Sequence, residues 1–114
     1  MYKRQDIEIT GRAAHAGVEP EKGLSSIRIA SEIITRLPQG RLDETTTVNV
    51  GTIEGGTVRN AVPESTTVKG EFRSTNLENL DELRVHITDA VHEVAKLFPE
   101  ATICLLYTSP SPRD

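Results

Sequence analysis

The stretch TTVKGEFRS, residues 66–74, alternates apolar and polar side chains and leads directly into a long helical pattern. Its two faces consist of Val68, Gly70 and Phe72 on one side, and of Lys69, Glu71 and Arg73 on the other. Such alternation is typical of a strand with one buried and one solvated face. The apolar stripe of the helix that follows contains Leu80, Leu83, Ile87, Ala90, Val94 and Leu97. This pairing predicts a sheet covered on one face by a helix.

Both ends of this helix carry sequence signals. Thr75 and Glu78 match a capping box, which predicts that the helix begins at this point. Pro99 ends the helix, and a further strand is expected to begin at Ala101.

The residues before this stretch predict two more strands and one more helix. DIEITGR, residues 6–12, alternates like a half-buried strand. Residues 24–37 carry apolar side chains at helical spacing, and Pro38 and Gly40 end that helix. Residues 45–56 form the second strand, in which a change of phase predicts a β-bulge near Gly51.

The resulting order is β-α-β-β-α-β. We expect an α+β fold of the ferredoxin-like type, with a four-stranded antiparallel sheet, both helices on one face and a truncated fourth strand. The other face of the sheet is left polar and open.

The two termini are expected to be foreign to the domain. MYKRQ, residues 1–5, and CLLYTSPSPRD, residues 104–114, back-translate into complementary ends of a transposon adapter used in sequencing libraries. A disordered tail rich in serine and proline is the alternative for the second stretch. On the adapter interpretation, residues 6–103 are an internal piece of a longer protein. Ile103, Leu105 and Tyr107 alternate, so the adapter residues should extend the fourth strand, with disorder from Ser109 onward.

Composition excludes several classes of protein. The net charge of −4 over 114 residues argues against a nucleic-acid partner, and the third strand lacks the stacking aromatics of an RNA-binding plait. There is no apolar run long enough for a membrane span. The single cysteine supplies no disulfide framework, and the cytoplasm is the default location. His86 and His92 do not share a helix face, and no pattern supplies a metal site.

Three stretches carry candidate functional residues. In GRAAHAGVEPEKG, residues 11–23, small residues flank His15, whose imidazole could donate to a developing oxyanion. In GTIEGGTVRNAVPES, residues 51–65, Gly55 and Gly56 permit close approach of a ligand, and Asn60 offers both a donor and an acceptor. Arg73 lies on the polar sheet face, where its planar fork could hold a carboxylate.

Each of these residues also has a structural alternative. His15 could be a solvent-exposed loop histidine, and residues 51–65 could be an ordinary long hairpin. Arg73 could balance Glu71 or Glu8 on a solvated face.

Taken together and in this order, the three stretches resemble the dimerisation or lid domain of the zinc exopeptidases. That family includes peptidase T, carboxypeptidase G, aminoacylase and succinyl-diaminopimelate desuccinylase. The resemblance covers residues 6–103 and is greatest to the peptidase T-like branch. It implies a lid inserted into a separate catalytic domain that holds two zinc ions, with no metal ligand and no cofactor in the present chain. The implied substrate is a peptide or an N-acyl amino acid.

The resemblance also implies roles for individual residues. His15 would hold the scissile carbonyl and its oxyanion, and Asn60 and Arg73 would bind substrate. A right-handed crossover makes the first two strands parallel, so His15 and Asn60 should lie at one end of the sheet and Arg73 at the other. A homodimer formed through the lid would resolve this separation, with His15 and Asn60 serving the partner's site. A free-standing plait that binds a ligand or a partner is the alternative function.

Overall fold

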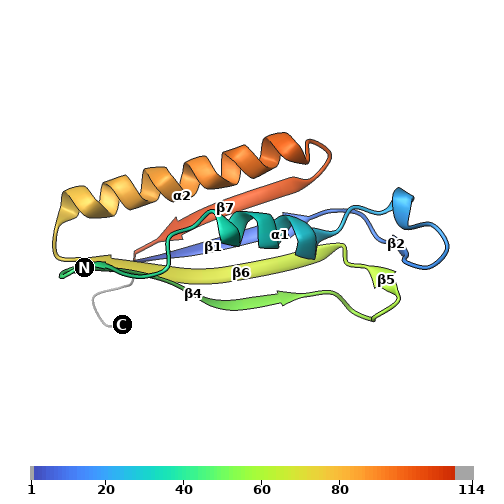
Figure 1. Cartoon of the computed structure of the whole chain (residues 1–114), viewed down its shortest axis with the longest axis horizontal. Helices are drawn as coiled ribbons and strands as arrows, with labels where there is room; N and C mark the ends of the chain where they lie inside the picture. Colours follow the sequence, from blue (N-terminus) through green and yellow to red (C-terminus); the bar gives the residue numbers. More distant parts are fainter. Residues whose placement is uncertain (1, 110–114) are drawn as a thin grey trace.

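Two helices cover one face of a five-stranded antiparallel sheet in the computed structural model, which describes residues 2–109 (Figure 1). The strand order is β3-β4-β6-β1-β7. These strands are β1 Tyr2–Thr10, β3 Gly40–Asp43, β4 Thr46–Gly55, β6 Ser65–Ser74 and β7 Thr102–Thr108. The helices are α1 Ser26–Thr35 and α2 Leu77–Leu97. The predicted fold class is confirmed.

The sheet has one strand more than the sequence predicted. β3 forms a hairpin with β4, and Gly40, expected only to end a helix, begins this strand with a φ of 84°. All four residues of β3 are exposed, so it has no apolar alternation that would have revealed it.

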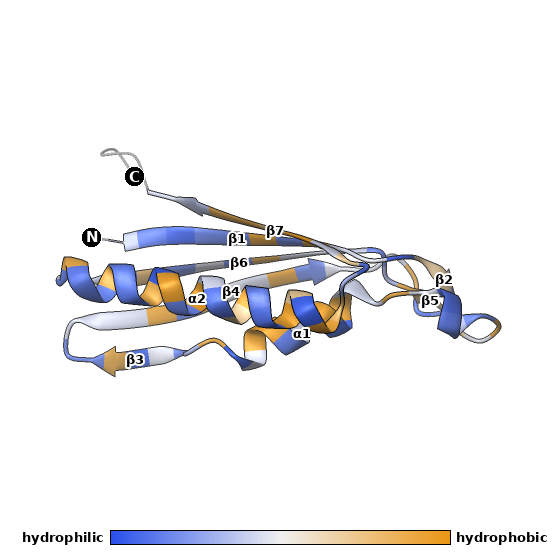
Figure 2. Ribbon diagram, turned by 90° about the horizontal axis from the view of Figure 1, so that it is seen from above, coloured by the Kyte–Doolittle hydropathy of each residue, from blue (hydrophilic) through white to orange (hydrophobic). Residues whose placement is uncertain are grey.

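The buried faces follow the predicted alternation. Ile7, Ile9, Val48, Val68 and Phe72 are all at most 1% exposed and form the sheet side of the core. Both helices turn a hydrophobic stripe toward them and a hydrophilic stripe outward (Figure 2). The predicted bulge is also confirmed, because the register between β4 and β6 shifts between Val50 and Thr52.

Two predictions about α2 are wrong. Its N-cap is Asn76, whose side-chain oxygen accepts hydrogen bonds from the backbone N–H groups of Glu78 and Asn79 at 2.9 and 3.4 Å. Thr75 lies one residue too early for this role. Leu97 is 58% exposed, while Phe98 packs against the core. Seven residues of a straight helix turn about 20° less than two full turns. The apolar face therefore drifts along the sequence, and at the end of α2 it contains Phe98 in place of Leu97.

The first helix is shorter than the predicted 24–37. α1 starts after Ser25, whose hydroxyl accepts a hydrogen bond from the backbone N–H of Arg28 at 3.1 Å. Leu24 instead pairs with Arg12 in an isolated bridge, and Leu37 reaches the core from beyond the helix end.

The two terminal stretches take part in the sheet. β1 begins at Tyr2, and β7 pairs with it from Thr102 to Thr108, so the predicted extension of the last strand is confirmed. Ser109 follows without regular structure, and the rest of the disorder prediction falls on residues 110–114, outside the described residues. None of the helices within residues 2–109 combines the length and apolarity needed to cross a membrane.

Gln5 is a polar residue in the core. Its side chain is 1% exposed, and neither its amide nitrogen nor its amide oxygen has a hydrogen-bond partner among residues 2–109. Such a buried, unsatisfied group costs about 1–3 kcal/mol. We therefore expect Gln5→Met, which keeps the length of the side chain, to raise the free energy of unfolding of the 114-residue chain by about 1–3 kcal/mol. Urea denaturation measures this change.

Gln39→Met is the matched control for this prediction. Gln39 is exposed, and its side-chain oxygen accepts a hydrogen bond from the backbone N–H of Val50 at 3.3 Å. Its replacement should be neutral or destabilising. A Gln5→Met chain no more stable than the original would show that the amide is satisfied in solution.

Candidate functional site

A small two-stranded ribbon projects beyond one end of the main sheet (Figure 1). It is built from β2 Ala14–His15 and β5 Ala61–Val62, together with the loops of residues 11–25 and 56–64, and is called the end ribbon below. His15 lies directly opposite Ala61, and the backbone N–H of Ala16 donates to the carbonyl of Asn60 at 2.9 Å. The end ribbon therefore brings together two of the candidate residues, as predicted.

The end ribbon is anchored to the sheet through Ser26. The backbone N–H and the hydroxyl of Ser26 both donate to the carbonyl of Pro63 at 3.0 Å. The same hydroxyl lies 2.8 Å from that of Thr66, and Ser26 is fully buried. Ser26 was not among the predicted site residues, although a serine in register with the apolar stripe of α1 was a usable signal.

The His15 imidazole is held in one orientation by the loop that follows it. Its Nδ1 accepts hydrogen bonds from the backbone N–H groups of Gly17 and Val18, both at 3.1 Å. A neutral imidazole that accepts at Nδ1 carries its proton on Nε2. His15 is exposed, so it presents a fixed Nε2–H donor to the outside of the end ribbon. This donor suits an oxyanion or a carbonyl oxygen.

Asn60 is held through its backbone, and its side chain remains available. The carbonyl is used by Ala16, while the side-chain amide has no hydrogen bond to any residue in the described range 2–109. An amide offers two donors and an acceptor for a bound group.

Gly55 and Gly56 are explained by the fold. A side chain at Gly55 would collide with Thr66 on the neighbouring strand, and Gly56 has a φ of 86°, which other residues rarely adopt. The close approach at Gly55 is therefore to the protein's own backbone and side chains. A ligand role for either glycine stays a prediction.

Arg73 lies on the polar face of β6 and already has partners. Its guanidinium forms a two-pronged contact with the Glu71 carboxylate, at 2.8 Å from Nε and 3.2 Å from the terminal nitrogen. These hydrogen bonds, followed by the attraction between the two charges, raise the pKa of Arg73 above its usual value. The guanidinium also lies over the Tyr2 ring, 4.6 Å from its centre. The structural alternative proposed for Arg73, a balancing contact with Glu71, is therefore present.

Arg73 and the end ribbon lie far apart. Arg73 is opposite Tyr2 at the start of β1, whereas His15 follows the end of β1. The rise of a strand places Ser65 and Arg73 about 26 Å apart along β6. The structure thus confirms that His15 and Asn60 share one end and Arg73 occupies the other.

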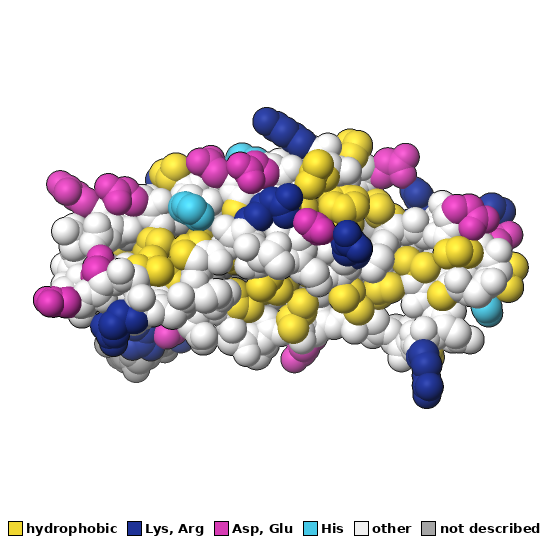
Figure 3. Space-filling view, in the orientation of Figure 1, with side chains coloured by type: hydrophobic (Ala, Val, Ile, Leu, Met, Phe, Trp, Pro, Cys, Tyr) yellow, Lys and Arg dark blue, Asp and Glu magenta, His cyan; other side chains and the backbone are white. Residues whose placement is uncertain are grey.

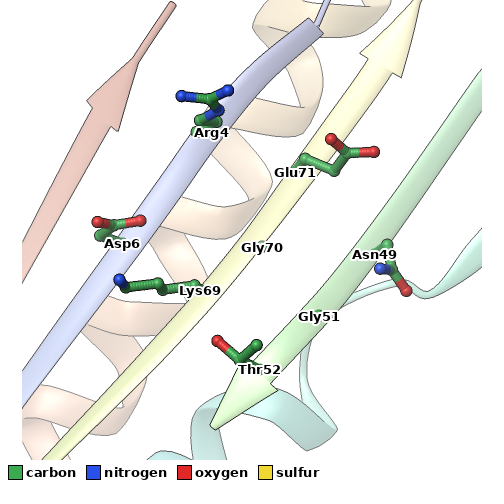
Figure 4. Close-up of a pocket in the computed structure, with 8 residues that line it drawn as sticks. All are labelled: Arg4, Asp6, Asn49, Gly51, Thr52, Lys69, Gly70 and Glu71. Carbon is green, nitrogen blue, oxygen red and sulfur yellow. The ribbon is translucent and has the colours of Figure 1, made fainter. Parts of the chain in front are cut away.

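The polar sheet face contains a shallow depression of about 320 Å³ between β1, β6 and β4 (Figure 4). Its charges compensate one another, because Asp6 lies opposite Lys69 and Arg4 lies opposite Glu71. The depression has no excess charge with which to attract an ion, and it does not contain His15, Asn60 or Arg73.

The described residues do not fit a metal site. Within residues 2–109, no three histidine, cysteine, aspartate or glutamate side chains gather closely enough to hold an ion. A catalytic zinc ion needs about three protein ligands and an open position. No step of a metal-dependent reaction is therefore assigned to this chain.

The fold and the sequence match one known class of domain. A family model described as the peptidase dimerisation domain matches residues 2–98, most of the chain. The chain belongs to the peptidase dimerisation domain family.

Individual relatives agree with this assignment. The uncharacterised protein YqjE of Bacillus subtilis strain 168 is 51% identical over 73 residues, covering 64% of this chain and 20% of that protein. Carboxypeptidase G2 of Pseudomonas sp. strain RS-16 is 28% identical over 109 residues, covering 93% of this chain and 25% of that protein. The crystal structure of aminopeptidase PepT from Bacillus cereus ATCC 10987 matches with a TM-score of 0.82 and 33% identity, covering 99% of this chain and 32% of that chain. The chain thus spans a third or less of the length of each.

Proposed function

We propose that this chain is the lid and dimerisation domain of a peptidase T-like zinc exopeptidase or amidohydrolase. The observation that carries the proposal is the fixed Nε2–H donor of His15 on a ribbon beyond the sheet. A donor held in advance stabilises a developing oxyanion without reorganisation during the reaction. The names of carboxypeptidase G2 and aminopeptidase PepT support a peptide or an N-acyl amino acid as substrate.

The zinc ions of this proposal lie outside the chain. Two zinc ions are held by a catalytic domain of the same polypeptide, and the lid closes over them. The length of the relatives, each at least three times that of their match to this chain, supports such a further domain. The length of the relatives also disfavours the alternative function, a free-standing module that binds a ligand or a partner.

The enzyme is a two-fold dimer in which each lid serves two centres. His15 donates to the scissile carbonyl in the partner's centre, and Asn60 and the backbone at Gly55 and Gly56 bind substrate there. Arg73 binds a substrate carboxylate in its own subunit's centre, where that carboxylate replaces or joins Glu71. The separation of the two ends of the lid supports this division.

We also propose that the native domain runs from residue 6 to residue 103. The unsatisfied amide of Gln5 supports a foreign origin for residues 1–5, since a native strand would place an apolar side chain there. The complementary adapter translations support the same origin for residues 104–114.

Comparison of the chain with its full-length parent tests the proposed function. The parent, purified with zinc, should release amino acids from a panel of dipeptides, tripeptides and N-acyl amino acids. The 114-residue chain alone should release none and should bind no zinc stoichiometrically, because residues 2–109 contain no cluster of ligands for catalytic zinc. Amino-acid release and calorimetry measure these properties. A parent that hydrolyses no member of the panel, or an active isolated chain, would refute the proposal.

A further inference from the structure

A hollow on the end ribbon contains a charged side chain that has no role in the scheme above. Its volume is about 400 Å³, and it lies between α1 and the segment that leads into β5. Its walls are the side chains of Ile27, Val58, Ala61 and Pro63 with the backbone of residues 55–57, and Arg59 is the one charged residue among those that line it. Hydrophobic side chains reach the surface near this end of the molecule in the view of Figure 3.

Arg59 differs from the other arginines of the described chain. Within residues 2–109, each of the others has a hydrogen bond, an ion pair or a ring contact; these are Arg4, Arg12, Arg28, Arg36, Arg41, Arg73 and Arg84. Arg59 has none of these contacts with the described residues. Its guanidinium is therefore free to form the two-pronged contact that suits a carboxylate.

The hollow and His15 are neighbours on the end ribbon. Ala61, which lines the hollow, belongs to β5, and Arg59 lies two residues before it in the turn that leads into this strand. His15 is directly opposite Ala61, and side chains opposite each other on paired strands rise on the same face. A substrate group held by His15 therefore lies next to the strand position that borders the hollow.

We propose that Arg59 and the apolar walls of this hollow form a subsite for an acidic side chain of the substrate. The side chain belongs to the residue that contributes the scissile carbonyl. His15 holds that carbonyl, and the side chain branches from the α-carbon that is bonded to the carbonyl carbon. Its methylene groups lie against Val58 and Ile27, and its carboxylate pairs with Arg59. This inference rests on the proposed function, and it makes Arg59 a specificity residue of the partner's centre.

Matched substrates test the subsite in the full-length zinc enzyme. The probes are three tripeptides that differ only in glutamate, glutamine or lysine at the residue contributing the scissile carbonyl. The original enzyme should prefer the glutamate peptide by about tenfold in kcat/KM, the effect of one hydrogen-bonded charge pair. Arg59→Gln should abolish this preference, and Arg59→Glu should reverse it in favour of a lysine peptide.

The control is Arg41→Gln, which changes an exposed arginine of β3 at a distance from the end ribbon. It should leave the preference unchanged. A preference that survives Arg59→Gln, or an original enzyme with a preference below about twofold, would overturn the subsite. Equal losses on the glutamate and glutamine peptides would show that Arg59 pairs with the protein itself and would also overturn it. An enzyme that cleaves none of the three peptides and no N-acyl amino acid would refute the proposed function instead.

Discussion

His15→Ala in the full-length enzyme should lower kcat by about two to three orders of magnitude, because it removes one donor to the developing oxyanion. KM should change much less, since the contact is stronger in the transition state than in the ground state. The reason is the geometry of the loop: Gly17 and Val18 occupy Nδ1, so the proton is held on Nε2 before substrate arrives. Steady-state kinetics on the best peptide of the panel measures both constants.

Two further variants separate this effect from a general loss of structure. His15→Gln retains a side-chain N–H donor and should recover part of the lost turnover, whereas a structural role would show no such recovery. His86→Ala, which removes an exposed histidine on α2, should leave kcat unchanged. If His15→Ala raises KM alone, or loses less than about tenfold in kcat, His15 is not an oxyanion donor.

The parts of the fold that depend on local periodicity could be predicted from the sequence. Residues 66–74 alternate because every second side chain enters the core, and this pattern needs no knowledge of distant residues. The cap of α2 could not be fixed in this way. Ser74, Thr75 and Asn76 are all capable caps, and only the direction in which the chain leaves β6 selects Asn76.

The candidate site also combines features that local sequence predicts with features that depend on the folded structure. The small residues around His15 indicated an exposed imidazole, but its tautomer depends on two backbone N–H groups that return to it only in the folded loop. Arg59 carried no signal at all, because a single exposed arginine is ordinary. Its difference from the other arginines is a matter of contacts, which only three-dimensional structure supplies.

If the domain acts as the proposed lid, its dimensions restrict how it can serve a catalytic centre. The dimerisation domain measures 51 × 29 × 20 Å, and its candidate residues lie near opposite ends of the long dimension. Hydrogen bonds require contact within about 3 Å, so a single substrate of a few residues cannot reach both ends of one lid. Two lids related by a two-fold axis can each offer one end to each centre.

Mixed dimers should therefore recover activity that both parent variants lack. In a dimer of one His15→Ala subunit and one Arg73→Ala subunit, one centre lacks both groups and the other lacks neither. Purified with two different affinity tags, it should show about half of the original kcat/KM, as expected for one intact centre in two. Each homodimer stays impaired, His15→Ala mainly in kcat and Arg73→Ala mainly in KM, because a carboxylate contact can be equal in the ground and transition states.

Unfolding of the Arg73→Ala subunit is not expected to account for its loss of activity. Arg73→Ala removes an exposed ion pair with Glu71, and exposed pairs contribute little to stability, so its melting temperature should stay close to the original. A mixed dimer of His15→Ala with Asn60→Ala is the control, because in the proposed division both residues serve the partner's centre and each centre then lacks one group. It should show no recovery. Recovery in this control, or its absence in the His15→Ala and Arg73→Ala pair, would mean that the lid does not divide its residues between two centres.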